Sequence, residues 1–230
     1  MSRPGVSLTA QQPLNNITRT AIEALAGVLG GTQSLHTNSY DEALALPSEA
    51  AVRIALRTQQ VIAHETGVTN TIDPLGGSYF VEALTDEIEA QAYDYFHKID
   101  ELGGMVEAVK RGFPQREIAD AAYTLQQEYD RRDRILVGVN DFTEGGEGEL
   151  ELLHIDPALE RKQIDRVQGV RARRDSAAVE AELASLREAA AGETNLMPNL
   201  LACARVHATE GEIVESLQQV FGTYTETPVF

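Results

Sequence analysis

The sequence lacks tryptophan, contains one cysteine, Cys203, and has only three lysines, Lys98, Lys110 and Lys162. A single cysteine excludes an intrachain disulfide framework of the kind found in small secreted proteins. No apolar run approaches the roughly 18 residues that cross a bilayer. The opening segment, MSRPGVSLTA, has no apolar core of a secretory signal. We therefore expect a cytoplasmic protein.

Positive charge is also scarce. Lysine and arginine together number 19 against 36 acidic residues, so the formal net charge is −17. Such a surface repels phosphate backbones and anionic membranes, which argues against nucleic-acid and membrane binding. An acidic, lysine-poor surface is typical of proteins from salt-adapted cells, and an acidic interaction surface is the alternative interpretation.

Apolar residues make up 43% of the 230 residues, which is enough for a hydrophobic core. Apolar spacing and stop signals predict helices at 13–31, 48–65, 81–102, 105–112 and 115–131. Strand candidates lie between them at 32–38, 68–73 and 135–139. This alternation is typical of an α/β fold with a parallel sheet. A closed parallel barrel needs about eight strands in roughly 250 residues, however, so either the sheet is very small or its N-terminal part is missing.

The composition changes after about residue 140. Residues 143–149, TEGGEGE, have the glycine and acid content of a linker and no core-forming residue. Beyond them only helices are predicted. Their starting signals are Asp156 with Pro157, Ser176, Pro198, and a capping box of Thr209 and Glu212.

Most generic functional motifs are absent. The glycines near residue 30 follow a helix and lack the dinucleotide-binding spacing, and His64 has no second histidine for a zinc site. Cys203 has the apolar neighbours of a buried structural thiol. The segment 33–42 is the best candidate site, because amide, imidazole and carboxylate groups gather there after a predicted strand. A polar loop with capping side chains is the alternative interpretation of the same segment.

The run from Gly30 to Pro47, GGTQSLHTNSYDEALALP, resembles the signature of the acyl-CoA mutases, of which methylmalonyl-CoA mutase is the best known. The preceding segment, Asn15–Ala24, is similar to the family's NN-x-x-RT-x-x-E-A helix. Further similar motifs follow in the same order at Asp73–Tyr79, Gly103–Met105, Val137–Asn140, Gly211–Ile213 and Val220–Gly222. Several independent motifs in one order make the resemblance specific.

The resemblance implies the C-terminal part of a catalytic chain: the end of a TIM-type (β/α)8 barrel followed by an α-helical extension. We therefore predict a partial barrel over 1–140, an acidic glycine-rich linker over 141–155 and a helical extension over 156–230. The family rearranges the carbon skeleton of an acyl-CoA by radical chemistry with adenosylcobalamin. We expect the isomerisation of methylmalonyl-CoA to succinyl-CoA, although isobutyryl, hydroxyisobutyryl and ethylmalonyl thioesters remain open.

The resemblance also implies cofactor-facing residues. Glu42 matches a glutamate near the cobalamin and its adenosyl ribose, Asn38 a residue near the same ribose, and Ala45 one that packs on the cofactor. Gly5 matches a glycine that lets the backbone approach the corrin ring. Gln33 matches an amide in the substrate region. No catalytic residue and no metal ligand is expected in this sequence.

Departures from the family pattern predict an incomplete enzyme. Val6 stands where the family has tryptophan, and the acyl-binding residues, the CoA channel and the cobalamin-binding D-x-H-x-x-G motif are not present. We therefore expect a chain that is inactive alone. An N-terminal barrel chain and a cobalamin-binding chain or domain would complete it, in an oligomer. The alternative is an inactive fragment kept as a binding or assembly module.

Overall fold

A computed structural model describes residues 6–144 and 150–225. The chain forms two compact units that divide between Leu153 and His154, inside the segment predicted as a linker over 141–155. Gly5 and linker residues 145–149 lie outside the described residues. No helix within the described ranges has the length and apolarity needed to cross a membrane.

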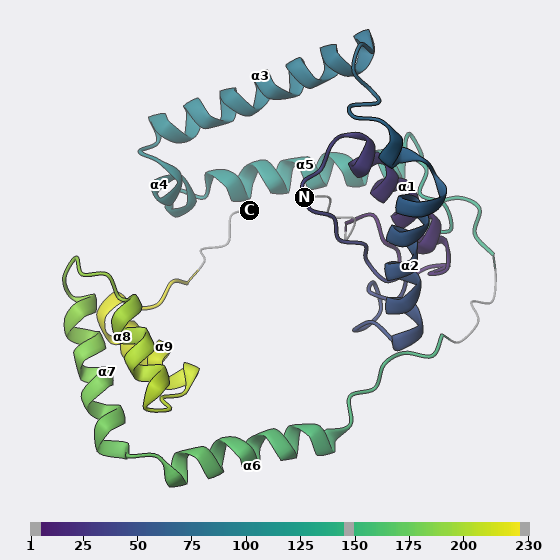
Figure 1. Cartoon of the computed structure of the whole chain (residues 1–230). Coiled ribbons are helices and arrows are strands. Elements are labelled where there is room, and N and C mark those ends of the chain that lie inside the picture. Colours follow the sequence, from purple (N-terminus) through teal and green to yellow (C-terminus); the bar gives the residue numbers. More distant parts are fainter. Residues whose placement is uncertain (1–5, 145–149, 226–230) are drawn as a thin grey trace. The chain divides into compact units, whose positions relative to one another are not determined.

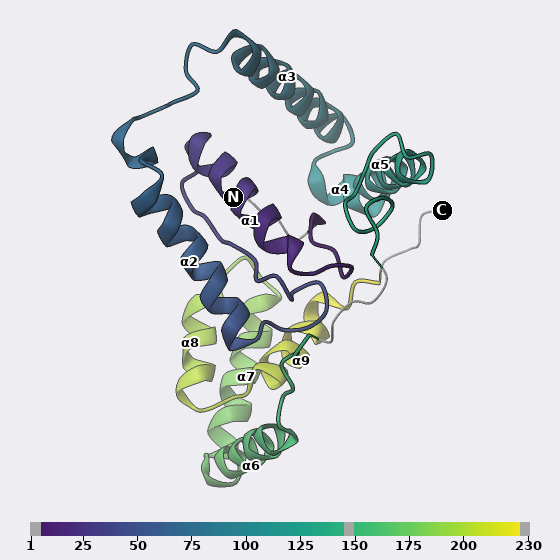
Figure 2. The ribbon, with the colours of Figure 1, turned by 90° about the vertical axis from the view of Figure 1, so that its right-hand side faces the viewer.

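Unit 1, up to Leu153, is built from helices joined by long polar turns (Figure 1). Helices α1 and α2 lie side by side (Figure 2), and small buried side chains, Ala24, Ala51 and Ala55, let them approach closely. The elements are α1 (Asn15–Leu29), α2 (Glu49–Glu65), the 3₁₀ turn η2 (Val68–Asn70), α3 (Tyr79–Glu101), α4 (Met105–Lys110) and α5 (Phe113–Asp130).

Unit 2, from His154, contains α6 (Pro157–Arg173), α7 (Ser176–Ala190), α8 (Met197–Arg205) and α9 (Glu210–Phe221). Helix α7 packs against both α8 and α9. Its apolar stripe of Val179, Leu183 and Leu186 meets the buried Cys203 of α8. Half-buried leucine, valine and isoleucine side chains from α8 and α9 close this core around the stripe.

The helix predictions are confirmed because their signals are local. Ser48 begins α2 by accepting a hydrogen bond from the backbone N–H of Ala51, and Gly67 follows the helix in the left-handed conformation that glycine tolerates. The capping box of Thr209 and Glu212 is present as predicted. Ser176 is a correction, because Asp175 is the residue that caps α7.

The strand predictions are wrong for the described residues. Residues 68–70 form a 3₁₀ turn, residues 32–38 form no named strand, and residues 135–139 contribute only an isolated bridge from Val137 to Asp141. A parallel strand needs neighbouring strands to satisfy its backbone N–H and C=O groups, and residues 6–144 and 150–225 place no strand beside these segments. The described chain is therefore mostly helical and contains no sheet, in contrast to the predicted α/β partial barrel.

The Ser48 cap gives a direct test of how α2 begins. Replacing Ser48 by alanine should lower the free energy of unfolding by about 1 kcal/mol, because one N–H of the first turn loses its acceptor. Thr58→Ala, at a half-buried position in the middle of α2, should cause no comparable loss because alanine favours helix. Urea unfolding followed by circular dichroism measures both, and equal losses would contradict the capping role.

Candidate functional site

Three of the residues predicted to face a cofactor, Asn38, Glu42 and Ala45, lie in the polar turn between α1 and α2. Glu42 is half-buried there, and both of its carboxylate oxygens accept hydrogen bonds within the turn. Its Oε1 accepts from the backbone N–H of Ser39 at 2.7 Å, and its Oε2 accepts from Nδ2 of Asn38 at 2.5 Å. A carboxylate offers about four acceptor positions, so Glu42 can accept two further hydrogen bonds in a fixed orientation.

Hydrogen bonds join the turn that carries Glu42 to α2. Asp41 is fully buried, and its Oδ2 accepts from the backbone N–H of Ser48 at 2.8 Å while its carbonyl accepts from the N–H of Ala45. Thr37, also buried, donates from its hydroxyl to the carbonyl of Ala55 at 2.8 Å. These contacts hold residues 37–45 in one position against the helix, so Glu42 sits on a supported turn.

A buried amide anchors the same turn to α1. The side chain of Asn16 is fully buried, and its Nδ2 donates to the carbonyls of Thr9 and Tyr40, both at 2.9 Å. Its Oδ1 accepts from the N–H of Thr9 at 3.1 Å and from Nη1 of Arg19 at 2.8 Å. Asn16 therefore fixes residue 40, two positions before Glu42, to the helix that precedes it.

Arg19 extends this network to a distant part of unit 1. Its Nη2 donates to the carbonyl of Val137 at 2.7 Å, and the Nε2 of Gln12 donates to the carbonyl of Phe142 at 3.1 Å. The loop between these carbonyls turns at Gly138, whose φ is +79° and whose added Cβ would lie 2.8 Å from the Gln12 side chain. The sequence motifs at 15–20, 38–42 and 137–140 are thus joined into one cluster.

The structure brings together some predicted site residues and not others. Asn38 and Glu42 are hydrogen-bonded, and Ala45 is half-buried in the same turn. Gln33 is exposed, and no hydrogen bond among the described residues joins it to Glu42. Gly5 lies outside the described residues.

Sequence reasoning missed the supporting roles of Asn16, Arg19 and Asp41. The spacing of Asn16 and Arg19 offered one signal, because residues three apart share a helix face and can form a single polar pair. Nothing local in the sequence indicated that Arg19 would reach Val137, which is 118 positions away.

Other reactive groups do not form a second site. Cys203 is buried in the core of unit 2, where burial and the nearby Glu182 raise the pKa of its thiol, which disfavours the nucleophilic thiolate. Within the described ranges, no three histidine, cysteine or acidic residues gather closely enough to hold a metal ion.

Comparison with known proteins finds one family over almost the whole chain. The family model described as methylmalonyl-CoA mutase matches residues 2–223. A methylmalonyl-CoA mutase of Rhizobium meliloti (strain 1021) is 46% identical over 97% of this chain and 32% of its own length. The large subunit of a 2-hydroxyisobutanoyl-CoA mutase from Aquincola tertiaricarbonis is 46% identical over 97% of this chain and 40% of its own. Methylmalonyl-CoA mutase of Escherichia coli (strain K12) is 47% identical over 96% of this chain and 31% of its own length.

The chain therefore spans about a third of the length of these relatives. The predicted position at the C-terminal end of the catalytic chain is not supported by these matches.

Proposed function

The chain belongs to the methylmalonyl-CoA mutase family, and we propose that it supplies a cofactor-facing part of an adenosylcobalamin-dependent acyl-CoA mutase. The observation that carries the proposal is the oriented Glu42 carboxylate, in a chain that the methylmalonyl-CoA mutase family model matches over residues 2–223. In this proposal the turn 38–45 faces the cofactor, and the substrate is bound largely by the part of the enzyme that this chain does not contain.

The residues present fit an adenosyl ribose by their chemistry. A half-exposed carboxylate with acceptor capacity to spare can accept hydrogen bonds from two vicinal hydroxyls. Asn38 positions that carboxylate through Nδ2, and Ala45 adds a small, half-buried side chain in the same turn. Adenosylcobalamin, when bound, supplies the homolytic chemistry of the rearrangement, and the residues of this chain orient its sugar and exclude water.

The acyl-CoA is most simply methylmalonyl-CoA, converted to succinyl-CoA in the cytoplasm. Relatives named methylmalonyl-CoA mutase support this substrate, and the relative named for 2-hydroxyisobutanoyl-CoA supplies the rival. That rival is named a large subunit, which supports a completing partner chain for this protein too. We further propose that the helices of unit 1 take their places around a TIM-type barrel when the remaining strands are supplied.

A binding or assembly module is the second candidate function. The observation that favours it is the set of exposed apolar side chains on α3 and α5. In that role the chain would retain the family cluster around Asn16 without taking part in catalysis.

The test is a completed enzyme that carries Glu42→Ala. The chain is combined with the rest of the catalytic body and a cobalamin-binding chain from the same organism, and adenosylcobalamin binding is followed by the visible spectrum of the cofactor. We expect the affinity to fall about tenfold to a hundredfold, as expected for losing charge-assisted hydrogen bonds. Isomerisation of methylmalonyl-CoA and of 2-hydroxyisobutanoyl-CoA is measured alongside.

Glu49→Ala is the matched control, because Glu49 begins α2 nearby and its side chain is 90% exposed in a surface ion pair with Arg53. It should leave the affinity unchanged. Equal affinities of wild type and Glu42→Ala would remove the cofactor role. A correctly assembled complex without isomerase activity on any acyl-CoA would favour the assembly module.

A further inference from the structure

Helix α6 is a basic element in an acidic chain. Its 17 residues carry five basic and two acidic side chains, a net charge of +3 in a chain whose net charge is −17. All five basic side chains are exposed, and no residue of α6 is buried. A helix that is polar on all sides and buries no face presents its charged surface to partners.

Three of these cations form a stripe along one side of α6. At about 100° per residue, Lys162, Arg166 and Arg173 lie within about 40° of one another and span about 17 Å of the helix. A Cβ added at Gly169 would lie 3.3 Å from Nη1 of Arg173, so this guanidinium lies along the stripe. None of the ion pairs among the described residues includes a member of this basic stripe.

Helix α3 has the opposite charge. Its 23 residues carry seven acidic side chains and one lysine, a net charge of −6, and none of its residues is buried. Asp86, Glu89 and Asp100 form an acidic stripe, because they lie within about 60° of one another along about 21 Å of the helix. Within residues 6–144 and 150–225, no ion pair includes these three carboxylates.

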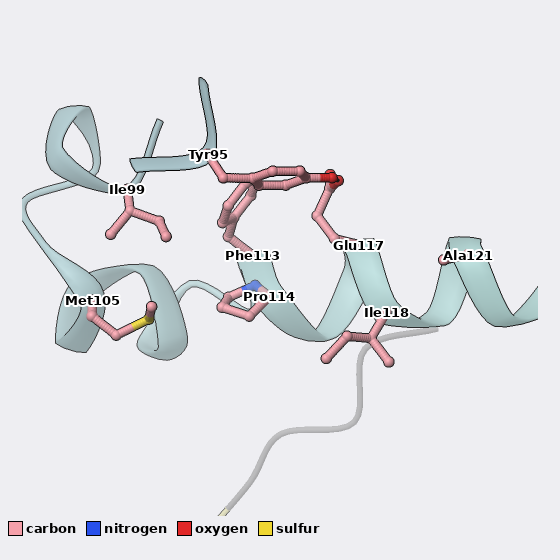
Figure 3. A pocket seen from close by; sticks show the side chains of 8 residues that line it. All are labelled: Tyr95, Ile99, Met105, Phe113, Pro114, Glu117, Ile118 and Ala121. Atoms are coloured by element: carbon pink, nitrogen blue, oxygen red, sulfur yellow. The ribbon is translucent and has the colours of Figure 1, made fainter. Parts of the chain in front are cut away.

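The apolar side chains of α3 lie on another side of the helix. Tyr95 and Ile99 line a pocket of about 330 Å³ together with residues of α4 and α5 (Figure 3). These two side chains are about 130° around the helix from the acidic stripe. The acidic stripe is therefore a surface separate from the apolar pocket, and it stays accessible whether or not the pocket is covered.

We propose that the basic stripe of α6 in one copy of this chain binds the acidic stripe of α3 in a second copy. Charge complementarity identifies the occupant, because the two stripes have opposite sign, similar length and no ion-pair partners of their own. Two chains of net charge −17 repel each other over most of their surfaces, so a basic helix is where an acidic copy can approach.

Several ion pairs must form together in this contact, since a single exposed pair contributes little. Each copy carries both stripes, so the same contact can form twice in a two-fold dimer. The inference does not depend on the proposed function, because neither stripe includes a residue of the Glu42 turn.

Sedimentation equilibrium of the full chain, without cofactor or acyl-CoA, tests the proposal. We expect dimers at about 0.15 M salt and a dissociation constant at least about tenfold weaker at about 1 M, where screening shortens the Debye length to about 3 Å. The variant Lys162→Glu/Arg166→Glu/Arg173→Glu reverses the basic stripe, and it should weaken self-association at least about tenfold because two acidic stripes then meet.

The variant Asp86→Lys/Glu89→Lys/Asp100→Lys reverses the acidic stripe and should weaken self-association to a similar degree. A mixture of the two variants should dimerise again, since each stripe of one variant meets opposite charge on the other. Neither an altered net charge nor an altered stability of a single variant explains such recovery. Circular dichroism checks that the helices are retained in both.

Arg53→Glu/Arg57→Glu/Arg205→Glu is the control for net charge, because it reverses three exposed arginines outside α3 and α6. It should leave the dissociation constant nearly unchanged. A wild-type chain that stays monomeric at about 100 μM would overturn the proposal. A dimer that neither high salt nor the stripe variants weaken would do the same, because it would form through another face, and so would a mixture that fails to associate. None of these outcomes bears on cofactor binding by Glu42.

Discussion

Replacing Arg174 by methionine should lower the free energy of unfolding of unit 2 by about 3–5 kcal/mol. Arg174 follows the end of α6, and its Nη1 donates to Oε2 of Glu212 at 2.7 Å in the first turn of α9. Its Nη2 donates to the other carboxylate oxygen, and Nη1 also reaches the carbonyl of His207 at 2.9 Å. The side chains are only 9% and 20% exposed, so removing the guanidinium leaves a poorly solvated carboxylate whose remaining cation is Arg171, at a longer 3.6 Å.

The effect of Arg174→Met should also depend on pH. The hydrogen bonds from Arg174 lower the pKa of Glu212 from 4.5 to about 2. Because the folded pKa is the lower one, ionised Glu212 stabilises the fold above about pH 4.5, and this contribution is lost as the pH falls toward 2. The difference between wild type and Arg174→Met should therefore be full at pH 7 and smaller at pH 3.

Urea unfolding of the full chain at pH 7, 5 and 3 measures this difference. Arg53→Met is the matched control, because the Arg53–Glu49 pair is exposed by 63% and 90% and such surface pairs contribute little. The double variant Arg174→Met/Glu212→Gln should recover part of the loss, since it removes both charges while glutamine can still accept the capping-box hydrogen bond from the N–H of Thr209. A loss at pH 3 equal to that at pH 7, or one no larger than for Arg53→Met, would contradict the role of the ion pair.

The sequence predicted the parts of the fold that depend on short-range interactions and missed those that depend on distant residues. Ser48, Asp156 and the Thr209–Glu212 box mark helix starts correctly because each cap bonds within one turn of its own helix. The segments predicted as strands failed because a strand is stabilised by neighbours that can lie anywhere in the chain or outside it. Their β-branched residues indicated burial, and the described chain offers no sheet to bury them.

The contacts of the candidate site also divide into short-range ones that the sequence predicted and long-range ones that it did not. Asn38 and Glu42 are four residues apart in a single turn, so their contact is short-range and could be expected from the motif. Gln33 lies in the same motif but is exposed, because a motif fixes order along the chain and not direction in space. The bond from Arg19 to Val137 spans 118 positions and depends on how α1 meets a distant loop. Only the three-dimensional structure could supply that contact.

Replacing Asn16 by alanine should also lower the free energy of unfolding strongly, because Asn16 holds the turn that carries Glu42. The variant removes an amide that makes four hydrogen bonds while fully buried. It leaves the N–H and C=O of Thr9 and the carbonyl of Tyr40 unsatisfied, at about 1–3 kcal/mol for each group that water cannot reach. We expect the free energy of unfolding of unit 1 to fall by about 4 kcal/mol.

Asn15→Ala is the matched control, because the neighbouring side chain is only half-buried and donates a single hydrogen bond, to Gln12 at 2.9 Å. It should lower the free energy of unfolding by about 1 kcal/mol or less. Equal losses for the two variants would contradict the anchoring role of Asn16.

Amide hydrogen exchange separates loss of global stability from loosening of the turn. If Asn16 anchors residue 40, Asn16→Ala should speed exchange at Ser39, whose N–H is held by Glu42, more than at Ala51 in the first turn of α2. In the completed enzyme the same variant should weaken adenosylcobalamin binding, although the Asn16 side chain is itself fully buried. A destabilised variant that binds the cofactor as tightly as wild type would show that Glu42 is positioned without Asn16. The support would then have to come from Asp41 and Thr37 on the α2 side of the turn.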